Sequence, residues 1–333
     1  HAEDKIYSAL GRLRELKEKR PDLLIGVIGC MAQKDQGQIF RRAPHVDLIL
    51  GPGQLGRLTD LLDRISAGEG PQMELSLDRA TGDRQSIQKS FARFEPDRPA
   101  KTRPVPHQAM VRVMFGCDKF CSYCIVPKVR GPEQSRPARE IVDEVRRLAD
   151  DGCLEVTLLG QTVNSYKDSS AGQTLRLSDL LYQVHDIEGI RRLKFVTNYP
   201  KHMTDDLIGA IRDLPKVSPY LHIPAQSGSN AILQRMKRAY TVEEYREMLH
   251  RIRTSIPHAA VTSDFIVGFC GETEDDFQQT ADLVRDETVA GRRKPENGCL
   301  SLPRKVPART PALPSGKGRP VPPQNRSSRI RSR

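Results

Sequence analysis

Three closely spaced cysteines are the residues of this sequence best suited to chemistry. Cys117, Cys121 and Cys124 form a C-x3-C-x2-C arrangement directly after the apolar run 110–115. Thiolates are soft ligands that select iron-sulfur clusters or zinc, and a turn lets such short spacings point to one centre. A four-iron cluster has four corners, so three cysteines leave one iron open to a small molecule. The spacing therefore predicts a 4Fe-4S cluster with one exchangeable position.

Two other interpretations of these cysteines are less favoured. A zinc site usually takes a fourth Cys or His at short spacing, and the nearest histidine, His107, lies ten residues before Cys117. A disulfide framework is typical of secreted chains, whereas this chain has seven cysteines, an odd number, and we expect no signal peptide.

The run GCDKFCSYCIVPKVRGPEQSRP (116–137) resembles the signature of the radical S-adenosylmethionine methylthiotransferases, and most of all their MiaB branch. Four further motifs match that family in order: GCMAQKDQ (29–36), LLGQTVNSY (158–166), LHIPAQSGS (221–229) and DFIVGFCGET (264–273). The similarity extends over residues 2–286. Two departures are Tyr199, where the branch usually has histidine, and Cys270, where it has proline.

The resemblance implies a mechanism and partners. The cluster of Cys117, Cys121 and Cys124 would bind S-adenosylmethionine and cleave it to methionine and a 5'-deoxyadenosyl radical, the cofactor supplying the radical chemistry. The implied substrate is C2 of N6-isopentenyladenosine at position 37 of tRNA. An electron donor such as flavodoxin or ferredoxin is implied, with an unknown sulfur donor. The alternatives are a threonylcarbamoyladenosine tRNA, a ribosomal-protein aspartate, or an inactive fragment that only binds an iron-sulfur cluster or RNA.

Cys30 is the second candidate metal ligand. It follows the apolar run 23–28, which predicts a buried parallel strand with Cys30 at its carboxyl end. The resemblance matches Cys30 to the last of three ligands of a second 4Fe-4S cluster, whose other two would precede His1. We therefore expect an amino-terminally truncated chain that does not complete sulfur insertion. Free cysteine is also often a buried hydrophobe, which is the alternative for Cys30.

The fold class predicted from the alternation of apolar runs and capped helical segments is α/β with a parallel sheet. The resemblance specifies a partial (β/α)6 TIM-like radical SAM barrel after an incomplete flavodoxin-like domain. We expect the amino-terminal domain over 1–74, a linker over 75–106, the incomplete barrel over 107–290, and a tail over 291–333. Barrel strands are predicted at 110–115, 155–159, 192–197, 219–223 and 261–267, with no sixth strand evident after Asp286. A helix is predicted over 35–42, and helices capped by Ser135 and by Thr241 with Glu244 are predicted over 138–149 and 245–255.

Polar residues follow several of these strands. Because barrel chemistry lies at the carboxyl ends of the strands, we expect cofactor-binding residues there: Gln161, Asn164, Gln226, Ser227 and Asp264. Their amide and hydroxyl groups can hydrogen-bond methionine and ribose. Loop capping is the alternative for the amides, and strand capping for Asp264. His222 lies within a strand and is interpreted as a core residue.

The charge is concentrated in the tail. Residues 291–333 hold 12 of the 53 Lys and Arg but only one acid, Glu296, and so account for the net charge of +11. A tRNA site must therefore rest on a local patch such as Lys128, Arg130 and Arg136. The Pro- and Arg-rich tail predicts disorder in place of the family's TRAM domain. We interpret it as a frameshift product or as an authentic RNA-binding tail. Mean hydropathy is −0.53, no membrane partner is expected, and a cytoplasmic location is expected.

Overall fold

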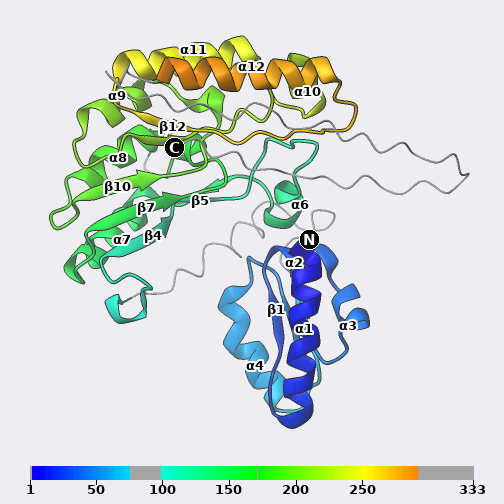
Figure 1. The fold of residues 1–333 in the computed structure, drawn as a ribbon. Coiled ribbons are helices and arrows are strands. Elements are labelled where there is room, and N and C mark those ends of the chain that lie inside the picture. The colour runs from blue at the N-terminus through cyan, green and yellow to red at the C-terminus, as the bar shows by residue number, and fades with distance from the viewer. Residues whose placement is uncertain (1, 76–98, 171, 292–333) are drawn as a thin grey trace, which may run out of the picture.

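The computed structural model of the chain describes residues 2–75, 99–170 and 172–291. Its described part contains two bodies, each built from parallel strands and helices (Figure 1). The smaller body comprises residues 2–75 and the larger one residues 99–291. They meet where α2 (Cys30–Asp35) contacts α6 (Val126–Arg130). This contact brings Cys30, the first cysteine of the sequence, beside α6, which follows Cys124 in the chain.

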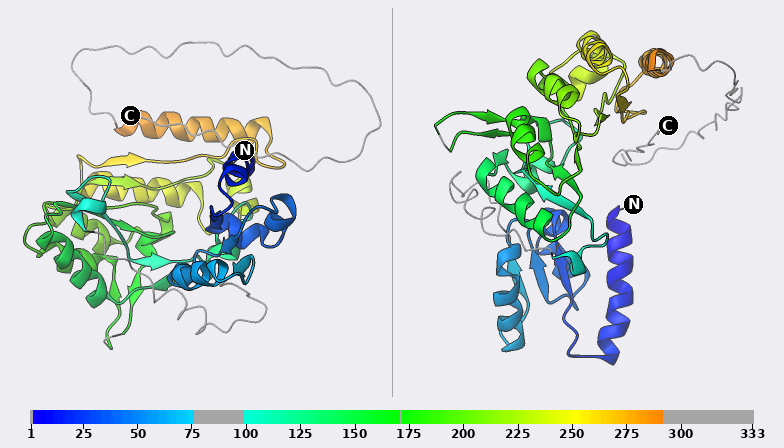
Figure 2. Two further views of the ribbon diagram at one scale, coloured as in Figure 1. Left: turned by 90° about the horizontal axis from the view of Figure 1, so that it is seen from below. Right: turned by 90° about the vertical axis from the view of Figure 1, so that its left-hand side faces the viewer.

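The smaller body is a parallel three-stranded sheet with helices on both faces. Strand order is β1-β2-β3, and the middle strand is fully buried. Ile49 packs with the cluster that includes Leu10 of α1, whereas Leu48 and Leu50 pack against Leu61 of α4. Figure 2 shows α1 and α4 on opposite sides of the sheet. The elements are α1 (Ala2–Lys19), β1 (Gly26–Ile28), α2 (Cys30–Asp35), α3 (Gln38–Arg42), β2 (Leu48–Leu50), η1 (Leu55–Arg57), α4 (Leu58–Ser66) and β3 (Gln72–Glu74).

Two expectations for this body are corrected. The strand before Cys30 is not buried on both faces, since Ile28 is 44% exposed. It is the edge strand of the described sheet, and of its three residues only Val27 is buried, together with Ile25 just before the strand. The expected helix 35–42 is instead the last residue of α2 and the whole of α3, because Gln36 adopts a left-handed backbone (φ 49°) that no α-helix continues through.

The larger body carries the main parallel strands. Strands β10, β7 and β4 form one sheet and β11 and β12 a second pair. A parallel bridge between Leu193 and Val217 links the chain before β11 to β10. The strands are β4 (Gln108–Arg112), β5 (Met114–Phe115), β6 (Gln134–Ser135), β7 (Glu155–Leu159), β8 (Lys167–Asp168), β9 (Leu175–Arg176), β10 (Arg192–Phe195), β11 (Tyr220–His222) and β12 (Ala260–Thr262).

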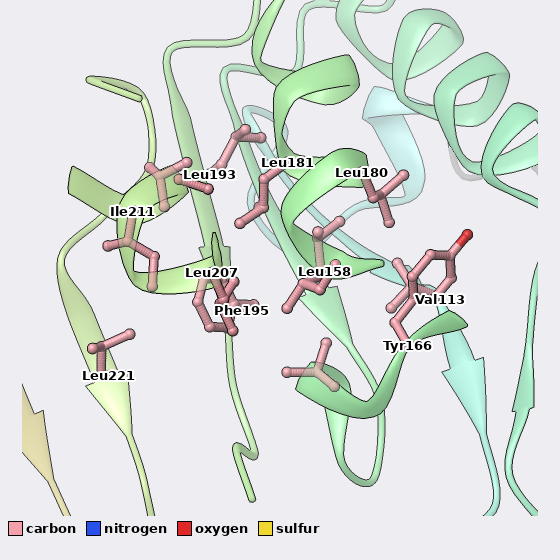
Figure 3. Packing of buried hydrophobic residues seen from close by; sticks show 14 of the residues in the cluster. Val113, Leu158, Tyr166, Leu180, Leu181, Leu193, Phe195, Leu207, Ile211 and Leu221 are labelled. Carbon is pink, nitrogen blue, oxygen red and sulfur yellow. The ribbon is translucent and has the colours of Figure 1, made fainter. Parts of the chain in front are cut away.

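Helices cover one face of these strands. Figure 3 shows Leu158, Phe195 and Leu221 of the strands packed toward Leu181 and Leu207 of the helices. Alternate residues of β7 are buried and half-buried, as expected for a strand with one face on the core. The helical elements are η2 (Ala100–Thr102), α6 (Val126–Arg130), α7 (Ala138–Asp150), η3 (Val163–Ser165), α8 (Leu177–His185), η4 (Pro200–His202), α9 (Asp205–Asp213), α10 (Asn230–Arg235), α11 (Val242–Ser255) and α12 (Glu274–Gly291).

The last helix closes the described part of the larger body. α12 lies alongside α11 (Figures 1 and 2). Glu287 of α12 bonds Arg246 at 3.2 Å and also pairs with Arg253 of α11. Leu283 of α12 is buried in the main core. Continuation of the helix to Gly291 occupies the first part of the segment in which the sixth strand was sought.

The strand predicted over 110–115 is two strands. Residues Gln108–Arg112 pair parallel with β7, whereas Met114–Phe115 pair antiparallel with Gln134–Ser135. Val113 lies between them and donates its N–H to Leu159 O at 2.9 Å. The break turns the chain out of the sheet and into the cysteine loop, so the first strand ends earlier than its apolar run suggests.

Helix capping was predicted correctly at one end and wrongly at another. Thr241 and Glu244 form a reciprocal capping box on α11, as their spacing predicts. Ser135 does not cap α7. Instead the Asp168 carboxylate, on β8 and thirty residues away, accepts the Ala138 N–H at 2.7 Å. No local pattern can reveal a cap supplied at that distance.

Several expectations lie outside the described residues. They include most of the linker (76–98) and the tail (292–333), and the division of the chain into four parts stays a prediction. Among the described residues, no helix is both long enough and apolar enough to cross a bilayer.

Candidate functional site

The cysteine loop leaves β5 and returns through α6 to β6, which closes it as a hairpin. The Cys117 N–H donates to Gly131 O at 3.0 Å, across the base of the loop. Gly116 has a φ of +78°, and a Cβ there would lie 1.9 Å from Pro132 O. Only glycine fits both the left-handed backbone and the close approach. The residue before the first cysteine therefore sets the path of the whole loop.

The second half of the loop is anchored to a distant segment. The Ser122 N–H donates to Met236 O at 3.1 Å, and its hydroxyl donates to Arg235 O at 2.9 Å. A turn closed by the Cys124 N–H on Cys121 O at 3.0 Å separates the last two cysteines. The end of α10 and the residue after it thus hold the loop from outside, in addition to the loop's own internal bonds.

The three sulfurs are free thiols in a sheltered environment. Cys117 and Cys121 are buried and Cys124 is half-buried. Burial raises the pKa of Cys117 and of Cys124, and the neighbouring Cys121 adds to the increase for both. Cys121 is thus near the other two. Within residues 2–75, 99–170 and 172–291, no three His, Cys, Asp or Glu side chains are grouped so as to hold a single metal ion.

This donor set fits an iron-sulfur cluster. Three soft sulfur ligands come from one loop whose shape is fixed at Gly116 and at Ser122, and none is used in a disulfide. Such clusters are held by cysteine thiolates, and their properties depend on hydrogen bonds to the sulfurs and on solvent exposure. Cys117, Cys121 and Cys124 would be the ligands.

Arg238 lies against the cysteine loop, and sequence reasoning did not select it. Its Nη1 lies 3.3 Å from Cys121 Sγ. Its guanidinium carbon lies 4.7 Å from the ring centre of Tyr199 and 4.9 Å from that of Tyr240. In the sequence, Arg238 lies in the run 236–240 directly after a helix, and this pattern does not indicate a residue near the cysteines. Only the fold brings it to Cys121.

A second charged group lies beside the loop. Lys119 Nζ is 3.2 Å from Glu133 Oε1, and the Thr162 hydroxyl donates to the same oxygen at 2.7 Å. Lys119 also lies over the Tyr199 ring at 5.2 Å. His202 is close by, with its ring centre 5.3 Å from that of Tyr199. Burial and then the Lys119 charge lower the pKa of His202 to about 4. Sequence reasoning did not select these residues, which link the cysteine loop to the loop after β7.

The two amides predicted to bind cofactor after β7 differ in their surroundings. Gln161 Oε1 is buried and has no hydrogen-bond partner among the described residues, so it can accept a bond from a bound molecule. Asn164 instead donates to Tyr199 O at 2.9 Å and accepts from the Tyr199 N–H at 2.8 Å. Its amide joins the loops after β7 and β10. The prediction that Asn164 also contacts cofactor stays a prediction.

The residues after β11 lie in a tightly bonded segment. Gln226 has a left-handed backbone (φ 71°) and pairs with Phe265 in a parallel bridge. Ser227 is 1% exposed, and its hydroxyl accepts the Ser229 N–H at 3.1 Å. It also lies 3.3 Å from the Thr280 hydroxyl. The structure thus gives the Ser227 hydroxyl partners within the fold, and cofactor binding by Gln226 and Ser227 is still a prediction.

The interpretation of His222 as a core residue is wrong. Leu221 points to the helices and is fully buried, whereas the next side chain, His222, points to the opposite face and is 24% exposed. His222 Nε2 lies 3.6 Å from Asp264 Oδ2, and its Nδ1 lies 3.1 Å from the Thr262 hydroxyl. Asp264, predicted to bind cofactor, therefore has an imidazole neighbour on β11.

Cys30 lies at the contact between the two bodies. It is the first residue of α2, and it accepts a hydrogen bond from Arg130 Nε at 3.3 Å. Two members of the predicted basic patch of Lys128, Arg130 and Arg136 already have partners within the chain. Arg130 contacts Cys30, and Arg136 forms an ion pair with Glu144 at 2.7 Å, in which about 16% of either side chain is exposed. Lys128 is the exposed member of the three.

Two family models match the sequence. One, described as the Radical SAM superfamily, matches residues 111–284, which is more than half of the chain. The other, described as the uncharacterized protein family UPF0004, matches residues 1–51. The first match contains the cysteine loop and the segment of Arg238, and the second contains Cys30.

Curated relatives carry one name. A tRNA-2-methylthio-N(6)-dimethylallyladenosine synthase of Rhodopirellula baltica is 57% identical over 283 residues, covering 85% of this chain and 59% of the relative. The synthase of the same name from Agrobacterium fabrum is 44% identical over 293 residues, covering 86% and 62%. The chain thus spans about three fifths of the length of these relatives.

Solved structures share the fold at low identity. The radical S-adenosylmethionine methyltransferase TsrM of Kitasatospora setae matches with a TM-score of 0.59 and 16% identity, over 84% of this chain and 56% of that one. The cobalamin-dependent radical enzyme OxsB matches with a TM-score of 0.57 and 14% identity, over 84% and 41%. Together with the family match over more than half of its length, this places the chain in the radical SAM superfamily.

Proposed function

We propose that the chain is a radical S-adenosylmethionine methylthiotransferase that adds a methylthio group to C2 of N6-isopentenyladenosine near the tRNA anticodon. The observation that carries the proposal is the closed loop with three free, sheltered thiols beside the carboxyl end of β4. The name shared by relatives at 44 to 57% identity supports the substrate class.

The proposed fold is a partial (β/α)6 barrel after a flavodoxin-like domain. The parallel pairing of β4, β7 and β10 and of β11 with β12 supports the barrel. The parallel sheet between α1 and α4 supports the smaller domain. In both folds ligands bind at the carboxyl ends of the strands. Cys117 and Cys30 each follow such an end.

In this proposal Cys117, Cys121 and Cys124 hold the cluster, and Cys30 contributes to a second one. When bound, the 4Fe-4S cluster and S-adenosylmethionine supply the radical chemistry. The chain's own residues orient them: Gln161 offers an unused buried acceptor, and Asn164 fixes the loop that carries it. Lys119, held by Glu133, places a positive charge beside the loop. The partners are tRNA and an electron donor such as flavodoxin or ferredoxin.

The test is anaerobic reconstitution of the 333-residue chain, followed by iron and sulfide counting and an assay for 5'-deoxyadenosine. We expect about one four-iron cluster on the three loop cysteines, and its loss in Cys117→Ala, Cys121→Ala and Cys124→Ala. Cys153→Ala is the matched control. This thiol is also buried, but it lies outside the loop and donates to the carbonyl oxygens of His107 and Glu155.

The possible results separate enzyme from binding module. Cleavage of S-adenosylmethionine that depends on the three loop cysteines supports the proposal. Loss of the methylthio mass from isopentenylated tRNA nucleosides in a knockout strain identifies the substrate. A chain that binds iron but never yields 5'-deoxyadenosine is an iron-sulfur module instead. Cluster content unchanged in all three alanine variants would exclude the proposed site altogether.

A further inference from the structure

We propose that Arg238 is a positioning residue that holds a positive charge against the sulfur of Cys121 and thereby raises the reduction potential of the cluster. The inference rests on the proposed function, because it requires a cluster on the cysteine loop. It adds to that function a residue from a different segment, 117 positions away in the sequence.

All three nitrogens of the Arg238 guanidinium are engaged. Nη1 points to Cys121 Sγ at 3.3 Å, Nε donates to the Tyr240 hydroxyl at 3.0 Å, and Nη2 lies 3.4 Å from Pro224 O. A planar fork with several fixed contacts has little freedom to turn away. The donor facing the sulfur is therefore oriented before any cluster is bound.

Two tyrosine rings hold the guanidinium in place. Its carbon lies within 5 Å of the ring centres of Tyr199 and Tyr240, which themselves make an edge contact at 5.7 Å. Both rings are fixed by their hydroxyls. The Tyr240 hydroxyl donates to Ala225 O at 2.8 Å, and the Tyr199 hydroxyl accepts the Ala239 N–H at 3.2 Å. Ring faces attract a cation without cancelling its charge.

The charge of Arg238 is not cancelled by a carboxylate either. Among the residues that the structure describes, no Asp or Glu forms an ion pair with it, whereas Arg246 and Arg253 on the next helix each pair with an acid. A sheltered cation with tyrosines, a carbonyl and one cysteine around it acts most directly on that cysteine. The positive charge of Arg238 therefore acts mainly on the sulfur of Cys121.

The expected effect follows from the charge that reduction adds. An electron entering a cluster held by three thiolates increases an existing negative charge, so a nearby cation stabilises the reduced form more than the oxidised form. An N–H to sulfur hydrogen bond acts in the same direction, and such contacts are known to set the potentials of these clusters. Removing Arg238 should make the cluster harder to reduce.

The experiment is a redox titration of the reconstituted 333-residue chain without S-adenosylmethionine, followed by electron paramagnetic resonance. Arg238→Gln removes the charge but keeps a polar side chain. Lys237→Gln is the matched control, because it removes one positive charge from the same turn at an exposed position. Arg238→Lys keeps the charge and loses the fork.

We expect the ratio of reduced to oxidised cluster in Arg238→Gln, at the wild-type midpoint, to fall at least about tenfold, which is about 59 mV for one electron. Lys237→Gln should titrate like the wild type, and Arg238→Lys should lie between. If Arg238→Gln fails to hold iron, a loaded Arg238→Lys whose midpoint lies below the wild-type value, while Lys237→Gln keeps that value, still supports the proposal, and an unchanged Arg238→Lys midpoint contradicts it.

Two results would overturn it. One is a fully loaded Arg238→Gln chain with an unchanged midpoint. The other is failure of both Arg238 variants to hold iron, which would assign the residue to packing only. A wild-type chain that takes up no cluster refutes the proposed function itself, and so differs from either result.

Discussion

Replacing Gly116 by alanine should open the cysteine loop at its base. The added Cβ would lie 1.9 Å from Pro132 O, whereas real Cβ contacts essentially never fall under 3.0 Å. The two sides of the hairpin must therefore separate by about 1 Å. A shift of that size carries the Cys117 N–H out of bonding range of Gly131 O, at present 3.0 Å away.

The energetic cost can be assembled from two parts. A residue with a side chain in the left-handed region costs about 1–2 kcal/mol, and φ at Gly116 is +78°. Loss of the backbone bond adds about 0.5–1.5 kcal/mol. We therefore expect the free energy of unfolding to fall by about 1.5–3.5 kcal/mol, and the displaced Cys117 to weaken cluster retention as well.

Gly152→Ala is the matched control. Gly152 has nearly the same backbone, with φ +79°, but a Cβ there meets no atom within 4 Å. It should cost only the conformational part, about 1–2 kcal/mol, and should leave iron content unchanged. Urea unfolding followed by circular dichroism gives the first quantity, and iron per chain after anaerobic reconstitution gives the second.

The reasoning fails if Gly116→Ala and Gly152→Ala lose equal stability and bind equal iron. That outcome would mean that the hairpin relaxes at no cost, and that the loop does not depend on the close approach of residues 116 and 132.

Three further predictions concern the body around the site. Asp168→Ala should destabilise the chain by about 1–2 kcal/mol in urea unfolding, because it removes the acceptor that caps α7; an unchanged midpoint would show the cap to be dispensable. Thr241→Ala should cost about 1 kcal/mol by loss of the capping box on α11, and a double variant with Glu244→Ala should add little more. His202, whose pKa burial lowers from 6.5 to about 4, stays neutral in the folded chain while its unfolded form takes up a proton. The contribution of neutral His202 to the free energy of unfolding is therefore full above pH 6.5 and is lost as the pH falls toward 4. In His202→Gln this part of the acid destabilisation should vanish, and a free energy of unfolding with the same pH dependence as the wild type would contradict the lowered pKa of His202.

Local patterns predicted much of the framework. The strand at 155–159 agrees residue for residue with β7, and the capping residues Thr241 and Glu244 start α11 where their spacing indicates. These features depend on neighbours within a few residues, which a sequence displays directly. The C-x3-C-x2-C spacing belongs to the same class, because one loop holds all three sulfurs.

Contacts between distant segments were not predictable in this way. The first strand ends at Arg112 because the chain then pairs with β6, and α7 is capped by Asp168, thirty residues along. His222 was misjudged since its exposure depends on which face of β11 the helices cover. Each of these outcomes depends on the fold as a whole, so local patterning could not decide between the alternatives.

By itself the sequence determined which groups are available for the proposed chemistry: three cysteine sulfurs within eight residues, and the alternation of strands and helices around them. Only the tertiary structure decided what surrounds those sulfurs. It brought Arg238 and two tyrosines to Cys121, and Arg130 to Cys30, from segments far away in the chain. The physical reason is that ligand identity is covalent and local, whereas the field and the solvent exposure at a sulfur depend on every element packed around it.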